Sequence, residues 1–187
     1  MSLDLRFERL IAARPERVFD AFTDPEGQRE FYGQDAPGWI VESRCDLRVG
    51  GVWSIRFGPG PDRLYHHRHV FEAIERPHRI LIASTETRPD GSSFETALEF
   101  TFEPRDGRTL MTMVQAGFPT EDLRDEHTVG VPNAFDRLAR TLDDHGRRVQ
   151  RPRQETDGQV RPLHVDVPRR VHHRARRRRR SGPRGRR

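Results

Sequence analysis

The stretch EDLRDEHTVGVPNAFDRLARTLDDH, residues 121–145, decides the predicted fold of this chain. Its apolar and half-polar residues recur at steps of three and four, the period of one helix face: Leu123, His127, Val131, Phe135, Leu138 and Leu142. Acidic residues open the stretch, and Gly146 follows it as the expected C-cap. Pro132 lacks a backbone N–H, so we expect a kink there, or a short helix followed by a longer one. The apolar face of this helix must be covered by the rest of the chain.

Upstream of the helix, alternating polar and apolar residues predict a run of antiparallel strands. The first spans residues 3–12, and two short helices follow it, one beginning at Pro15 and one at residues 28–32. Turn signals separate further strand candidates at 39–45, 52–57, 63–75, 79–88, 94–103 and 110–118. The inner faces of the last two are predicted to be Phe94, Thr96, Leu98, Phe100 and Phe102, and then Leu110, Thr112, Val114, Ala116 and Phe118.

This order of elements predicts an α+β fold: a curved antiparallel sheet of about six to seven strands wrapped around a long C-terminal helix, with two short helices after the first strand. A strongly twisted sheet of this length curls, and its concave face needs a cover. Between sheet and helix lies either a filled core or a cavity of the kind that binds small molecules.

The charge distribution divides the chain at residue 146. All 34 basic residues are arginine, which suggests a GC-rich coding sequence and a bacterial source. Residues 147–187 hold 16 Arg against three acids, whereas residues 1–146 hold 18 Arg against 26 acids. We therefore expect a domain over 1–146 and a disordered Arg-rich tail over 147–187. Clustered arginines can bind phosphates, but no aromatic residue is interleaved to stack on bases, so nucleic-acid contact is not the favoured interpretation. A solvated extension and a shifted reading frame stay open.

Cysteine usage and hydropathy predict a cytoplasmic protein. Cys45 is the single cysteine, which excludes an internal disulfide. The first residues lack the continuous apolar core of a signal peptide, and no run of 18 apolar residues could span a membrane.

Four segments in this order resemble one known family: RLIAARPERVFDAFTDPE (9–26), RVGGVW (48–53), VFEAIERP (70–77) and FDRLARTL (135–142). They are similar to homologues of the activator of heat shock protein 90 ATPase, within the START-like (SRPBCC) superfamily. The resemblance covers residues 3–145 and implies a helix-grip fold. It leaves the activity open, because members of the superfamily bind lipids or hormones, cyclise substrates or contact chaperones.

Inward-facing aromatic and apolar residues, with three histidines, are the candidate cavity lining: Trp53, Ile55, Phe57, Tyr65, His67, His69, Phe71, Phe94, Leu98, Phe100, Phe118, His127, Val131 and Phe135. A polar end of the ligand would be oriented by His67, His69, Tyr65 or Arg56. His67 and His69 share a strand face, as metal-binding pairs do, and His127 or Glu86 would be the third ligand. We predict no metal, no other cofactor and no catalytic residue, and interpret these histidines as part of the pocket wall.

The favoured hypothesis is a domain that encloses a small hydrophobic or aromatic molecule between sheet and terminal helix. One alternative is a module that docks on a chaperone through the convex face of the sheet. Another is a cyclase or hydrolase that uses the pocket histidines, although the chain has no Gly-x-Ser-x-Gly motif and no phosphate-binding loop. A homodimer is compatible with each of these.

Overall fold

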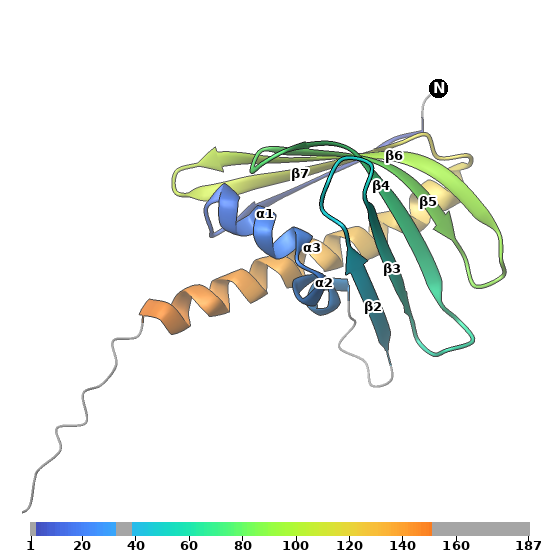
Figure 1. The fold of residues 1–187 in the computed structure, drawn as a ribbon, viewed down its shortest axis with the longest axis horizontal. Helices are drawn as coiled ribbons and strands as arrows, with labels where there is room; N and C mark the ends of the chain where they lie inside the picture. The colour runs from blue at the N-terminus through green and yellow to red at the C-terminus, as the bar shows by residue number, and fades with distance from the viewer. Residues whose placement is uncertain (1–2, 33–38, 151–187) are drawn as a thin grey trace, which may run out of the picture. The chain divides into compact units, whose positions relative to one another are not determined.

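The computed structural model describes residues 3–32 and 39–150, which form one sheet and three helices (Figure 1). The strands are β1 (Leu5–Ile11), β2 (Ile40–Cys45), β3 (Val52–Gly58), β4 (Tyr65–Glu75), β5 (Arg79–Thr87), β6 (Ser93–Arg105) and β7 (Arg108–Ala116). The helices are α1 (Pro15–Thr23), α2 (Pro25–Tyr32) and α3 (Glu121–Gln150). This element order is the predicted one.

All seven strands are antiparallel to their neighbours and lie in the order β1-β7-β6-β5-β4-β3-β2. The first strand therefore pairs with the last, and α1 and α2 connect the two opposite edges of the sheet. Figure 1 shows the sheet curling so that α3 crosses its concave side. These features confirm the predicted helix-grip fold.

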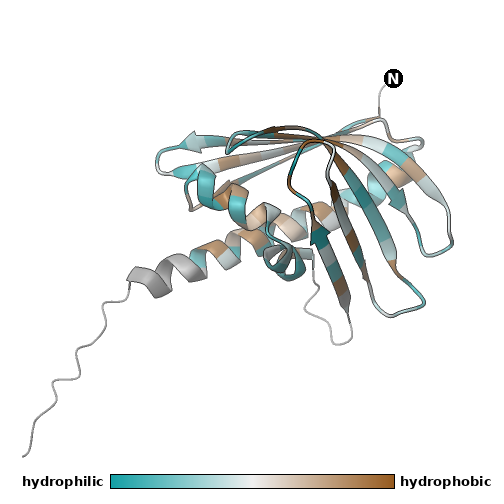
Figure 2. Ribbon diagram, in the orientation of Figure 1, coloured by the Kyte–Doolittle hydropathy of each residue, from teal (hydrophilic) through white to brown (hydrophobic). Residues whose placement is uncertain are grey.

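The strands alternate between apolar and polar residues, as Figure 2 shows by colour. On β6 the predicted inner face is confirmed, because Thr96, Leu98, Phe100 and Phe102 are buried. On β7 the prediction is wrong by one residue: the buried inner face is Thr109, Met111, Met113 and Gln115. The register explains this, since Gln115 and Met113 lie directly opposite Leu98 and Phe100 and so share their face.

The amphipathic stripe predicted for α3 is confirmed, with Phe135, Leu138 and Leu142 buried against the rest of the domain. The helix is assigned as one element through Pro132, so a break into two helices there is wrong, as is the C-cap at Gly146. A glycine inside a helix costs only about 1 kcal/mol, which is too little to end it. Residues 147–150 continue α3, and the remainder of the predicted tail, 151–187, lies outside the described residues.

Aromatic side chains from α1 fill one part of the concave side. The ring of Phe22 lies 4.6 Å from that of Phe100, 5.4 Å from that of Trp53 and 5.7 Å from that of Phe31, measured between centroids. Phe19 packs edge-on against Phe102 at 5.5 Å. Because α1 and α2 cover this part of the sheet, the open space on its concave side lies beside these helices and against α3.

We expect Leu138→Ala, in which a side chain only 2% exposed is truncated, to lower the free energy of unfolding by about 2–4 kcal/mol. Val129→Ala is the matched control on the same helix, since Val129 is 69% exposed, and should change it by no more than about 0.5 kcal/mol. Urea unfolding of both variants measures the difference. Equal losses would show that α3 does not pack on the sheet through the Leu138 face.

Candidate functional site

A cavity of about 1200 Å³ lies between the concave face of the sheet, α2 and α3. Ten of the fourteen residues predicted to line it do so: Phe57, Tyr65, His67, His69, Phe94, Leu98, Phe100, His127, Val131 and Phe135. Their side chains come from β3, β4, β6 and α3, elements that are distant in sequence and meet only because the sheet curls. The cavity wall is therefore a product of the fold and not of any single motif.

The other four predicted residues do not line the cavity. Trp53, Ile55 and Phe71 are buried in the core, and Trp53 is covered by Phe22 and Tyr32. Phe118 instead packs behind the wall, with its ring 5.0 Å from that of His127 and 6.2 Å from that of Phe94. A residue on the inner face of a strand thus lies either in the core or at the cavity, depending on which helix covers it.

Several lining residues were not among those predicted. These include Phe31 and Tyr32, at the end of α2, and Trp39, just before β2. The sequence signal for Phe31 and Tyr32 was a pair of adjacent aromatic residues at the end of a short helix. Gln115 was missed because its strand face was assigned the wrong way round, and Glu86 was considered only as a metal ligand.

Six polar side chains gather at one end of the cavity, and we call them the polar cluster: Tyr32, His67, His69, Glu86, Gln115 and His127. At its centre is the carboxylate of Glu86, which is only 4% exposed. Nε2 of Gln115 donates to its Oε1 at 2.7 Å, and Nε2 of His127 donates to its Oε2 at 2.8 Å. These hydrogen bonds join β5, β7 and α3, so the cluster also holds the helix on the sheet.

His127 carries a proton on both ring nitrogens. Its Nδ1 lies 2.8 Å from the carbonyl oxygen of Leu123, which can only accept, and its Nε2 faces the Glu86 carboxylate. Burial opposes the charge, but the hydrogen bond and the charge of Glu86 outweigh it and raise the pKa of His127. Burial likewise opposes ionisation of Glu86, yet the surrounding histidines, His67 and His127, lower its pKa. The two groups therefore form a buried imidazolium–carboxylate pair.

His67 and His69 are neutral members of the cluster. Burial lowers the pKa of His69 to about 3, and burial also lowers the pKa of His67 despite the opposing charge of Glu86. Nε2 of His67 is 3.3 Å from Oε2 of Glu86. Nδ1 of His69, a residue only 2% exposed, has no hydrogen-bond partner among the described residues. The site thus holds polar atoms that the domain itself does not satisfy.

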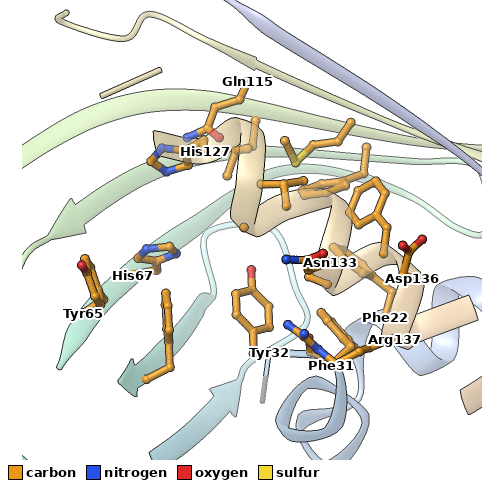
Figure 3. A pocket seen from close by; sticks show the side chains of 18 of the residues that line it. Phe22, Phe31, Tyr32, Tyr65, His67, Gln115, His127, Asn133, Asp136 and Arg137 are labelled. Atoms are coloured by element: carbon orange, nitrogen blue, oxygen red, sulfur yellow. The ribbon is translucent and has the colours of Figure 1, made fainter. Parts of the chain in front are cut away.

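The hydroxyl group of Tyr32 points from α2 into the open space between His67 and α3 (Figure 3). Its ring packs against Phe57 at 5.6 Å between centroids, and the ring of His67 packs against the same Phe57 at 4.9 Å. Burial, with the charge of Glu86, raises the pKa of Tyr32, so this hydroxyl keeps its proton. Tyr32 is therefore available as a hydrogen-bond donor.

Three polar contacts fasten α3 around the cavity. Glu126 accepts two hydrogen bonds from Arg88 at 2.6 and 3.2 Å, and Asp136 pairs with Arg9 of β1. Nε of Arg137 donates to the carbonyl oxygen of Phe31 at 2.8 Å, which links α3 to α2. Since the ion pairs are exposed, each contributes at most about 1 kcal/mol. They fix the position of α3 more than they stabilise the domain.

No group of three His, Cys, Asp or Glu side chains among the described side chains of residues 3–32, 39 and 41–143 is arranged to hold a metal ion. None of the helices in the described part of the chain is both long and apolar enough to cross a membrane.

The curved sheet, with α3 across its concave face and a cavity between them, defines a helix-grip domain. A family model described as Activator of Hsp90 ATPase homolog 1-like protein matches residues 12–143, and the chain belongs to this family. The search of curated proteins gave no match.

Solved structures from bacteria share the fold. Protein CV1439 from Chromobacterium violaceum is 22% identical, with a TM-score of 0.64 over 75% of this chain and 97% of that one. Protein Ms6760 from Mycobacterium smegmatis is 21% identical, with a TM-score of 0.63 over 75% and 90%. Protein Mll3558 from Rhizobium loti is 22% identical, with a TM-score of 0.62 over 74% and 96%. At these identities the likeness shows the fold alone.

The raised pKa of His127 predicts a pH-dependent stability. Its contribution to the free energy of unfolding is complete below the ordinary pKa of 6.5 and is lost as the pH rises through the raised value. The loss caused by His127→Gln should therefore be larger at about pH 6 than at about pH 9 in urea unfolding. The pKa values of His67 and His69 are lowered, so their protonation in acid destabilises the folded state. Each variant is therefore compared with wild type at the same pH.

His78→Gln, at an exposed position in the turn between β4 and β5, is the matched control for this experiment. Because the His78 side chain is exposed, this substitution should change the free energy of unfolding by no more than about 0.5 kcal/mol. If the loss from His127→Gln were the same at both pH values, the charged pair with Glu86 would not form.

Proposed function

We propose that this protein binds a small hydrophobic or aromatic molecule, held between the concave face of the sheet and α3. The observation that carries the proposal is the cavity of about 1200 Å³, which is somewhat larger than the usual small-molecule site of about 300–1,000 Å³. Its wall combines apolar side chains such as Leu98, Met113 and Val131 with the polar cluster. Removal of apolar ligand surface from water would supply most of the binding free energy.

The charged and the uncharged groups of the polar cluster have different roles, and this difference supports binding without strong catalysis. In the polar cluster the charged atoms of Glu86 and His127 already contact protein groups, so they hold the architecture. The uncharged side chains of Tyr32 and His67 are the ones left for a ligand. Uncharged donors and acceptors orient a ligand at small desolvation cost and suit a carrier or sensor.

We expect Ala134→Trp to fill the cavity from α3 and to weaken binding of the neutral fluorescent probe N-phenyl-1-naphthylamine at least about tenfold, because the indole occupies the space the probe needs. Ala97→Trp is the matched control, since Ala97 is exposed on the outer face of β6. Wild type and Ala97→Trp should bind one probe per chain in a fluorescence titration. Native mass spectrometry of freshly purified protein should show a retained small molecule. Absence of saturable binding to wild type would contradict the proposal.

A second candidate function is contact with a chaperone. The family description names an activator of the Hsp90 ATPase, and a shallow groove of about 630 Å³ lies on the outer face of the sheet between Arg68, Glu72 and Ala116. The floor of this groove is formed by small residues, among them Ala83 and Ala97. If the groove docks a chaperone of the Hsp90 type, Ala97→Trp should abolish its co-purification and Ala134→Trp should leave it intact. The two variants thus separate the two functions.

A further inference from the structure

The polar cluster has a definite set of unused hydrogen-bonding atoms, and these restrict the chemistry of the ligand. Both N–H groups of the Gln115 amide are engaged, one with Glu86 and one with Oγ1 of Thr96 at 3.0 Å. Both N–H groups of His127 are engaged as well. Glu86 therefore meets donors on each oxygen. None of these groups offers a free N–H or a bare charge to a bound molecule.

Tyr32 and His67 are the cluster members with a free polar atom next to the open space. Nε2 of His67 faces the Glu86 carboxylate, so the single proton of this neutral ring belongs on Nε2 and Nδ1 is an acceptor. The Tyr32 hydroxyl carries a proton and has no hydrogen-bond partner within the described part of the chain. Both rings rest on Phe57, at 4.9 and 5.6 Å, which places one acceptor and one donor beside the same space.

We propose that the polar cluster selects a neutral aromatic ligand with a hydroxyl group, which donates to Nδ1 of His67 and accepts from the Tyr32 hydroxyl. A hydroxyl both donates and accepts, which matches this pair of atoms, whereas an ether or a ketone can only accept. The inference rests on the proposed function, because it specifies the ligand of the same cavity.

Charge balance argues against an ionic ligand. The cluster already contains one negative charge, on Glu86, and one positive charge, on His127, and the two are hydrogen-bonded to each other. A carboxylate placed beside them would be uncompensated within the cluster, because its positive group, His127, is already paired with Glu86. In the cavity wall, Arg88 and Arg9 are likewise paired with Glu126 and Asp136, and Arg137 donates to the carbonyl oxygen of Phe31. An ammonium group would meet a carboxylate whose charge is already compensated by His127 and which accepts a hydrogen bond on each oxygen.

The test is a titration of the full chain with four probes that share one ring system: 2-naphthol, 2-methoxynaphthalene, 2-naphthoate and protonated 2-naphthylmethylamine. Wild type should bind 2-naphthol about tenfold more tightly than the methoxy compound, the factor expected for one or two added hydrogen bonds. The two ionic probes should bind more weakly than 2-naphthol by at least the same factor.

His67→Phe, which keeps an aromatic ring against Phe57 but removes the acceptor, should reduce the preference for 2-naphthol over its methyl ether to about threefold or less. The ether cannot donate to His67, so its affinity should not change, and it is the internal control for damage to the cavity. Tyr32→Phe removes a donor from which the oxygen of either probe can accept, so it should weaken the binding of both probes and leave the preference unchanged. Far-ultraviolet circular dichroism confirms that each variant is folded.

The outcomes separate this inference from the proposed function. Equal binding of all four probes to wild type, or tighter binding of an ionic probe, would overturn the hydroxyl selectivity and leave ligand binding standing. An unchanged preference in His67→Phe, or unchanged affinity for both probes in Tyr32→Phe, would also overturn it. Failure of every probe to bind wild type would overturn the proposed function and this inference together.

Discussion

The concave face of the sheet has to be covered, and the helices of this chain cover only part of it. Phe19 and Phe22 of α1 fill the space over β6 and β7, where they pack with Phe100 and Phe102. Farther along, α3 spans the sheet at a distance that its side chains do not fill. Protein interiors are otherwise close-packed, so a space of about 1200 Å³ is too large to be a packing defect. The cavity exists because one long helix does not fill the concave side of a curled seven-stranded sheet.

The buried carboxylate of Glu86 links stability to the site. A charge at 4% exposure is costly unless donors surround it, and Gln115 and His127 supply them from β7 and α3. The same hydrogen bonds that satisfy Glu86 fix the ring of His127 and set the proton of His67. Removal of the carboxylate would therefore disturb both the packing of α3 on the sheet and the arrangement of the polar cluster.

Much of the fold could be predicted from local periodicity, because α3 and β6 each have one consistently apolar face. The strand β7 could not, since Leu110 and Val114 lie on one face and Met111 and Met113 on the other. Gln115 resembles an outward residue in sequence. It lies inside because Glu86 and Thr96, on other strands, satisfy its amide. The positions of Tyr32 and Trp39 depend on how α2 and the segment before β2 sit against the sheet, which no local pattern encodes.

The pairing of β1 with β7 imposes an order on folding. Leu5 pairs with Gln115, so the first strand to be synthesised finds its partner only after more than a hundred further residues have been made. The strands β2 to β6 pair with their sequence neighbours and can form hairpins as they emerge from the ribosome. Until β7 arrives, β1 keeps a row of unpaired backbone N–H and C=O groups. Closure of the sheet is thus a late event, and a nascent chain shorter than about this length is the form most exposed to chaperones and to aggregation.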